Sequence, residues 1–353
     1  LALGQDLLRG ADPDGHPLLR YASPEIDQLE DAAPAPGGDL FIVGATASAW
    51  AGGPDCSAKD LICRAGFVAR VSPTGQIRWR HRLTGTSRSN GATHVAWDAA
   101  RRQVVVVAHE RMERRDFQVD LLVAAFDADG RPRWQRRFDR RDSRSDRMGA
   151  KGLALGPDGA VVIVGETGGD LAGAKHRGVA YNGAHNGWDV FVLKLAADGR
   201  TVFSRMFGVP DPDPDRVPTQ YNDYAQAVAV AADGGIWVVG QTDGDLLRGR
   251  KLKAWRSFTL RLDPAGRRPR ATYAPNTEPL PVALSFGPQG QLYRLGLVTG
   301  GDVRPVEAPL GQADLVLERL SPAGRRQWAV RFGTDRREAA GGLAVAADGS
   351  VWV

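Results

Sequence analysis

The sequence predicts an all-β protein, a six-bladed β-propeller built from four-stranded antiparallel blades. Three observations lead to this fold. First, a turn that ends in glycine recurs at intervals of roughly 55–70 residues, and such a period indicates a repeat architecture; its glycines are Gly15, Gly75, Gly130, Gly199, Gly266 and Gly324. Second, strand-like runs flank every turn, and no stretch has a helical period. Third, the two ends of the chain carry complementary halves of the repeat.

One repeat is clearest between residues 225 and 273. Strand A (225–230) alternates small and apolar residues, and strand B (236–240) follows a tight turn that contains Gly234. Strand C (257–262) comes after a longer segment, and strand D ends near Tyr273 after the turn at Gly266. Four antiparallel strands repeated in this way are typical of a propeller blade.

The remaining blades follow the same frame. The five complete repeats span about residues 25–83, 91–138, 149–207, 224–273 and 280–332. The first has a weak strand A (26–33), and the second has Ala100-Arg101-Arg102 where the others have a glycine turn.

The two ends are expected to complete a sixth blade. Residues 5–21 match strands C and D, whereas residues 341–353 match strands A and B. A half-blade leaves an open sheet edge, so we expect the halves to pair, with Val353 near Leu7, in one domain over residues 1–353. The alternative is a fragment of a longer protein with a seventh blade.

Composition limits the function classes. The chain has 353 residues and a net charge of +5 from 46 basic and 41 acidic side chains. Its densest basic stretch, 131–147, also contains three aspartates. A solvated outer strand explains this stretch better than an anionic partner does, so nucleic acid is not expected. No apolar run approaches the roughly 20 residues of a transmembrane helix.

Two cysteines, Cys56 and Cys63, lie in one predicted loop. A disulfide between them implies an oxidising compartment, and two free thiols in a cytoplasmic protein are the alternative. A zinc site is not expected, because zinc needs more ligands than these two. We predict the disulfide.

Loop length points to one face of the predicted disc. The A–B and C–D turns are tight and share one face, whereas the B–C and D–A segments share the other. The long segments are nearly all of the second kind, at residues 47–65, 168–187, 208–223, 244–255 and 300–312. We call this side the long-loop face and expect the binding function there, because function is usually carried by loops on a rigid scaffold.

Three features of these loops are candidate sites. Asp211, Asp213 and Asp215 alternate with prolines; they are predicted calcium ligands, or else a stiff acidic spacer. His176 and His185 could hold a metal with a carboxylate, but a polar surface loop is the favoured interpretation. Four aromatic residues form a predicted partner-binding set for sugar or protein, or else pin the loops to the disc; they are Trp50, Tyr181, Tyr221 and Trp255.

Three tryptophans, Trp79, Trp134 and Trp328, each lie four positions after the turn glycine. A position that recurs in several repeats is better explained by repeated packing than by a single site. We therefore predict that these tryptophans are structural.

The repeat resembles the bacterial SBBP-type β-propeller repeat. The resemblance rests on residues 189–208 and 224–242, with Asp189-Val190-Phe191-Val192-Leu193-Lys194 followed by Trp237-Val238-Val239-Gly240-Gln241-Thr242. That family is named for seven blades, whereas six are counted here. The resemblance implies a bacterial protein that is exported to the periplasm, the outer-membrane surface or the medium, often as a lipoprotein with its lipid anchor outside the chain shown.

The Gly-x-x-x-Trp spacing is also similar to the tryptophan-docking repeat of quinoproteins, although their adjacent cysteine pair is missing. We expect a non-catalytic binding or scaffolding module for a protein or glycan partner. No cofactor other than calcium and no catalytic residue is expected. The alternative is an enzyme with its site in the central channel, either a quinoprotein-like oxidoreductase or a hydrolase or lyase.

Overall fold

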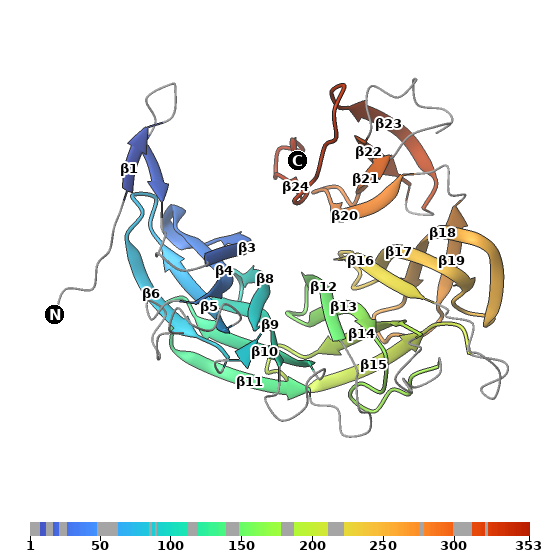
Figure 1. The fold of residues 1–353 in the computed structure, drawn as a ribbon, viewed down its shortest axis with the longest axis horizontal. Coiled ribbons are helices and arrows are strands. Elements are labelled where there is room, and N and C mark those ends of the chain that lie inside the picture. The colour runs from blue at the N-terminus through green and yellow to red at the C-terminus, as the bar shows by residue number, and fades with distance from the viewer. Residues whose placement is uncertain are drawn as a thin grey trace. The chain divides into compact units, whose positions relative to one another are not determined.

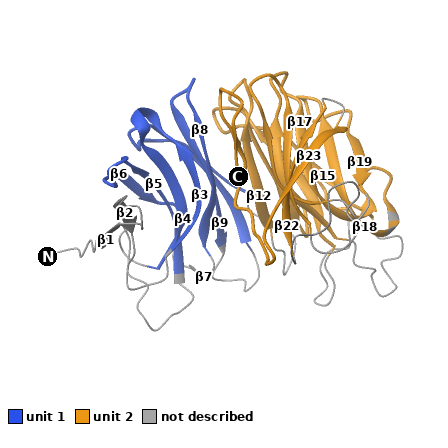
Figure 2. Ribbon diagram, turned by 90° about the horizontal axis from the view of Figure 1, so that it is seen from above, with its two compact units in different colours: residues 1–139 blue, residues 140–353 orange. Residues whose placement is uncertain are grey.

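A computed structural model shows the protein as a series of antiparallel sheets (Figure 1). It describes residues 8–11, 17–20, 27–47, 63–84, 87–88, 90–111, 119–138, 148–177, 187–210, 222–274, 279–298, 313–321 and 324–353. The chain divides into two compact units, Leu1–Asp139 and Arg140–Val353, coloured blue and orange in Figure 2.

Unit 1 contains a short hairpin and two blades. The hairpin is β1 (Leu8–Ala11) and β2 (Pro17–Arg20). Blade 1 consists of β3 (Asp27–Pro34), β4 (Leu40–Thr46), β5 (Cys63–Val71) and β6 (Ile77–Arg82), with β7 (Ser87–Arg88) added beside β5. Blade 2 consists of β8 (Gly91–Asp98), β9 (Gln103–Arg111), β10 (Val119–Asp127) and β11 (Pro132–Phe138).

Unit 2 contains three blades and a terminal hairpin. Blade 3 consists of β12 (Met148–Leu155), β13 (Val161–Thr167), β14 (Asp189–Leu195) and β15 (Thr201–Phe207). Blade 4 consists of β16 (Asp223–Val230), β17 (Ile236–Asp245), β18 (Arg250–Leu262) and β19 (Arg270–Ala274). Blade 5 consists of β20 (Leu280–Phe286), β21 (Leu292–Val298), β22 (Asp314–Leu320) and β23 (Arg326–Phe332). The terminal hairpin, a separate two-stranded sheet, consists of β24 (Ala344–Val345) and β25 (Val351–Trp352).

The predicted A–D order of the five complete blades is confirmed, because each of these sheets pairs its strands in chain order. Within the described residues the one helical segment is a short 3-10 turn at Pro36–Gly38, and no helix is long and apolar enough to cross a membrane. The ends form two-stranded hairpins, as the half-repeats predict, and β24 lies beside β20 in unit 2. That these hairpins complete a sixth blade stays a prediction.

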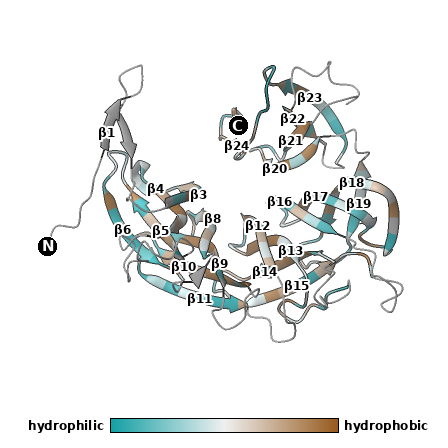
Figure 3. Ribbon diagram, in the orientation of Figure 1, coloured by the Kyte–Doolittle hydropathy of each residue, from teal (hydrophilic) through white to brown (hydrophobic). Residues whose placement is uncertain are grey.

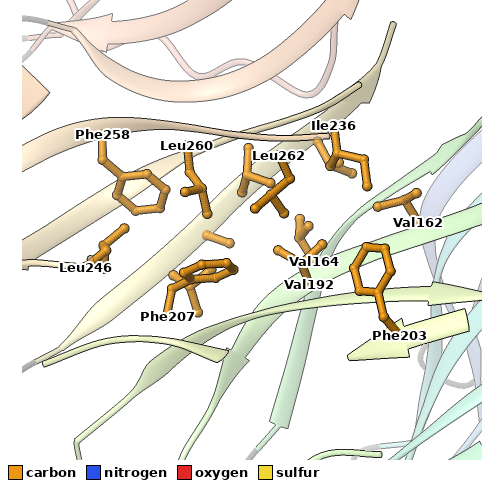
Figure 4. Packing of buried hydrophobic residues seen from close by; sticks show 14 residues of the cluster. Val162, Val164, Val192, Phe203, Phe207, Ile236, Leu246, Phe258, Leu260 and Leu262 are labelled. Carbon is orange, nitrogen blue, oxygen red and sulfur yellow. The ribbon is translucent and has the colours of Figure 1, made fainter. Parts of the chain in front are cut away.

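The core lies between neighbouring sheets. In unit 2, a cluster joins blades 3 and 4 and includes Val162, Val192, Phe203 and Phe258 (Figure 4). A second cluster joins blades 4 and 5, and in unit 1 a third joins blades 1 and 2. The middle strands β13 and β14 are buried along their whole length, which explains their unbroken apolar sequence. The outer strand β11 is mostly exposed and hydrophilic (Figure 3).

Each inner strand contains a β-bulge at the same place, which the sequence reasoning did not predict. In blade 4 the register shifts between Ala225 and Ala227, and all five complete blades have an equivalent shift. The bulge brings the inner strand close to strand B. A Cβ on Gly240 would lie 2.0 Å from the carbonyl oxygen of Tyr224, so this position needs glycine.

Trp79 has the predicted structural role. Its Nε1–H donates to the carbonyl oxygen of Ala128 in the next C–D turn at 2.8 Å, and its ring packs against Phe41 and Phe126. Trp328 differs, because its side chain is 38 % exposed and its ring meets Tyr293 edge-on at 6.0 Å. Trp134 is partly buried.

Candidate functional site

Strand pairing places the long loops of each unit 2 blade at one end of its sheet. In blade 3, Thr167 at the end of strand B pairs with Asp189 at the start of strand C, and Phe207 pairs with Val190. The opposite end carries tight turns, such as the one closed by Gly199 N–H to Ala196 O at 2.9 Å. The predicted arrangement of loops within a blade is therefore confirmed in blade 3.

The B–C segment of blade 4 is more regular than expected. The sequence predicts an irregular loop over 244–255, whereas β17 and β18 form a hairpin in which Asp245 pairs with Arg250 and Gly244 with Lys251. Residues 252–255 bulge opposite Asp243 before pairing resumes at Arg256, so this part is irregular as predicted. We call residues 241–257 the hairpin arm. The predicted loop was too long because loop length was judged from charge and from the distance between apolar strand cores, whereas backbone pairing across the hairpin extends both strands.

The tip of the hairpin arm is fixed to the core. Leu246 is fully buried in the cluster between blades 3 and 4 (Figure 4). The hydroxyl of Tyr273 donates to Asp245 Oδ1 at 3.0 Å and accepts the N–H of Leu246 at 2.8 Å. Burial, together with the bond to Asp245, raises the pKa of Tyr273. These contacts make the arm a rigid support rather than a free loop.

The hairpin arm carries an exposed aromatic pair. Trp255 is 39 % exposed, and its ring stacks on Tyr224 of β16 with centroids 5.8 Å apart and planes 5° from parallel. We call Trp255 and Tyr224 the aromatic platform. Burial is the main cause that raises the pKa of the Tyr224 hydroxyl, and the nearby carboxylates of Glu166, Asp243 and Asp223 raise it further. Tyr224 therefore stays neutral.

Two buried carboxyl groups lie beneath this end of the blades. Asp189 and Asp223 are both at most 1 % exposed. A Cβ built on Gly208 would lie 1.8 Å from Asp189 Oδ1 and 3.1 Å from Asp223 Oδ2, so both oxygens flank the same point. Burial, with the carboxylates of Asp189 and Asp243 adding to it, raises the pKa of Asp223 to about 8.

The hydrogen bonds of Thr242 fit a protonated Asp223. The Oγ1 atom of Thr242 lies within hydrogen-bond distance of Asp223 Oδ1 and of the carbonyl oxygen of Gly244. A hydroxyl has one hydrogen to donate. If Asp223 carries a proton and donates it to Thr242, the hydroxyl can donate to Gly244 at 2.7 Å, and both contacts are satisfied.

A second carboxyl group with a raised pKa lies nearby in blade 3. Glu166, near the end of β13, is 8 % exposed, and burial raises its pKa to about 7 although the ammonium of Lys151 opposes this. Lys151 Nζ lies 3.4 Å from Glu166 Oε1, and Lys151 is the bulged residue of β12. Glu166 can therefore exchange a proton near neutral pH.

The structure describes the side chains of two predicted site residues, Trp255 and His176. His176 is buried, with Nε2 donating to the carbonyl oxygen of Gly187 at 3.1 Å and lying 3.7 Å from Asp189 Oδ2. The backbone N–H of Arg177 donates to the same Asp189 oxygen at 2.5 Å. His176 is thus part of the loop packing rather than of an exposed polar surface.

The other predicted site residues lie outside the described part of the chain. They are Asp211, Asp213, Asp215, Trp50, Tyr181, Tyr221, His185 and Cys56, and of Cys63 the structure describes the backbone at the start of β5. Among the described side chains, no group of three or more His, Cys, Asp or Glu residues has the geometry to hold a metal ion.

Sequence reasoning missed Asp223, Tyr224, Glu166 and Lys151. A signal for this region was present, because Gly-x-Thr occurs late in strand B of both blade 3 and blade 4 and Asp189 opens a strand C. The signal did not identify the site, since the bulges that place Lys151 and the hairpin arm that presents Trp255 depend on tertiary contacts.

Comparisons with known proteins give no family. No family model matches the chain, and no curated protein matches it. Among solved structures, the chain is similar to a virginiamycin B lyase from Staphylococcus aureus, with 10% identity, a TM-score of 0.48, and coverage of 94% of this chain and 78% of that one.

Two further solved structures are similar at the same level. An ulvan lyase, a polysaccharide lyase of family PL25, has 11% identity and a TM-score of 0.47, and the match covers 90% of this chain and 69% of that one. A glucose dehydrogenase has 15% identity and a TM-score of 0.44, and the match covers 93% of this chain and 94% of that one. Likenesses with TM-scores below 0.5 carry no information on activity.

Proposed function

We propose that this chain is a non-catalytic binding module that engages a glycan through the aromatic platform on the long-loop face of unit 2. The observation that carries the proposal is Trp255, which is exposed and lies flat on Tyr224 at the base of a rigid hairpin arm. A flat exposed indole can cover the apolar C–H face of a sugar ring, and nearby polar groups can bond its hydroxyls.

The size and surroundings of the platform favour a glycan over a protein partner. A stable protein interface buries roughly 800 Å² on each partner around several apolar anchors. Among described residues, Trp255 is the one exposed large hydrophobic residue on the hairpin arm. Lys151, in the neighbouring blade, has an exposed side chain and adds a hydrogen-bonding group on this side. This combination suits a sugar ring, and a protein partner is the other outcome of the test.

The proposal is tested by screening the purified protein against a panel of glycans and comparing two tryptophan variants. Trp255→Ala should weaken binding of any glycan hit about tenfold, because it removes the stacking surface. Trp328→Ala is the matched control, since Trp328 has nearly the same exposure, 38 % against 39 %. Equal affinities of both variants, or binding of proteins alone, would contradict the proposal.

A second candidate function is catalysis by a hydrolase or lyase. The observation in its favour is the pKa of about 7 that burial gives Glu166, with Lys151 at 3.4 Å, since proton-transfer groups work best near their own pKa. Incubation with each bound glycan, followed by analysis for new chain ends, tests it. Product formed by the wild type but not by Glu166→Gln would establish that the protein is an enzyme. If the glycan stays intact, the proposal of a non-catalytic binding module stands.

We also propose that the protein is exported. The resemblance to the SBBP-type repeat and the cysteine pair Cys56 and Cys63 support this localisation. The state of these thiols is the direct check.

A further inference from the structure

The hairpin arm has a basic sequence. Residues 241–257 contain five basic residues and two acidic ones, so their formal net charge is +3. The basic residues are Arg248, Arg250, Lys251, Lys253 and Arg256. Arg248 and Arg250 are exposed at and beside the tip, and Arg256 directly follows Trp255. More than half of the chain's formal net charge of +5 therefore resides in this short segment.

The acidic groups of this region are engaged in other contacts. Asp243 Oδ1 accepts the backbone N–H of Asn222 at 3.2 Å. Asp245 Oδ1 accepts the backbone N–H groups of Leu247 and Arg248, both at 3.1 Å, in addition to the Tyr273 hydroxyl. Asp223 is fully buried and bonded to Thr242. Glu166 pairs with Lys151. A ligand that approaches the aromatic platform along the hairpin arm therefore meets the exposed guanidinium groups of Arg248 and Arg250.

The spacing suits a polymer. Arg250 pairs with Asp245, and Arg256, which directly follows Trp255, pairs with Thr242, three residues away on β17. With a rise of about 3.4 Å per residue, roughly 10 Å along the ladder separate these two positions. A single sugar on the aromatic platform cannot reach both positions, whereas several linked sugars can. Guanidinium groups bind carboxylate and sulfate oxygens through paired hydrogen bonds.

We propose that the hairpin arm makes the glycan site selective for anionic polysaccharides, chains whose sugars carry carboxylate or sulfate groups. This inference rests on the proposed glycan-binding function and adds the ligand class. Trp255 supplies the sugar-stacking surface, and the arginines of the hairpin arm supply the charge selection. Nucleic acid, which is also anionic, is a competing ligand that the experiment separates.

The experiment measures affinity for four probes at low and high salt. The probes are polygalacturonate, dextran sulfate, neutral dextran and a single-stranded DNA oligonucleotide. At low salt we expect at least one anionic polysaccharide to bind about tenfold or more tightly than dextran, with the gap narrowing as salt screens the charges. DNA should bind more weakly than that polysaccharide, and the opposite order would overturn the inference.

Paired variants separate the hairpin arm from general charge. Arg248→Gln/Arg250→Gln should lower affinity for the anionic polysaccharide about tenfold and leave binding of neutral dextran unchanged. Arg200→Gln/Arg267→Gln removes two exposed arginines from the C–D turns of the same unit and should have little effect. Equal losses in both pairs would assign the binding to net charge and overturn the inference.

The outcomes also distinguish this inference from the function on which it rests. If neutral glycans bind as tightly as anionic ones and Trp255→Ala weakens both, glycan binding stands and the charge selection is wrong. If no glycan binds, both are wrong. Melting temperatures of all variants check that they are folded, which is expected because the four arginines are exposed.

Discussion

Replacing Asp223 with asparagine should make the protein less sensitive to alkaline pH. The wild-type carboxyl group is fully buried beside Asp189, and its pKa is raised from 3.8 to about 8. The folded state therefore holds this proton more tightly than the unfolded chain does. The associated stability is fully present below about pH 4 and is lost as the pH rises to about 8, after which the loss is complete.

The size of the effect follows from the shift. Each unit of pKa difference corresponds to about 1.36 kcal/mol, so the full range from 3.8 to about 8 amounts to roughly 6 kcal/mol. Between pH 5 and pH 9 the wild type should lose about 4 kcal/mol from this group. Asparagine keeps a donor and an acceptor for Thr242 but has no charge to bury, so Asp223→Asn should not show this loss.

The assay is urea unfolding of the wild type and Asp223→Asn at pH 5 and at pH 9. The difference between their free energies of unfolding should move in favour of the variant by about 4 kcal/mol as the pH rises. Asp198→Asn removes an exposed carboxylate from a C–D turn in the same unit, and its difference from wild type should stay constant over this range. A change below about 1 kcal/mol for Asp223→Asn would refute the reasoning.

Four further predictions concern other parts of the chain. Trp79→Ala should lower the free energy of unfolding by about 3 kcal/mol, measured by urea titration, because it removes the ring and its bond to the next blade. Arg102→Gly should raise the free energy of unfolding by about 0.5–1 kcal/mol, because Arg102 has φ +47°, a backbone conformation that glycine adopts with less strain. Calcium should raise the Tm of the wild type but not of a variant with Asp211, Asp213 and Asp215 changed to asparagine. Thiol titration of denatured, unreduced protein should find Cys56 and Cys63 without free thiols.

The blade architecture could be predicted from the sequence because local signals agree with one another. The turn glycines, such as Gly199 and Gly266, have positive φ values in the structure, as a tight turn of this kind requires. The apolar runs of strands B and C are buried on both faces, which is why 161–164 and 190–193 read as continuous strands.

The candidate site could be predicted only in part. Trp255 was expected in a binding set, but its support by Tyr224 depends on how the hairpin arm packs against β16, which no local sequence pattern specifies. The burial of Asp223 and Glu166 depends on how blades 3 and 4 pack, and a charged residue at a strand end looks the same in sequence whether it is buried or exposed. Tertiary packing therefore decides the chemistry of this site.

The most direct test of the central claim is a hydrogen–deuterium exchange footprint of the protein with a bound anionic polysaccharide. A ligand on the aromatic platform should slow exchange in peptides that cover residues 222–224 and 250–256. Peptides that cover the tight turns 196–200 and 263–267, at the opposite ends of the same sheets, should not change. Protection at the tight turns with none on the hairpin arm would contradict binding at the long-loop face.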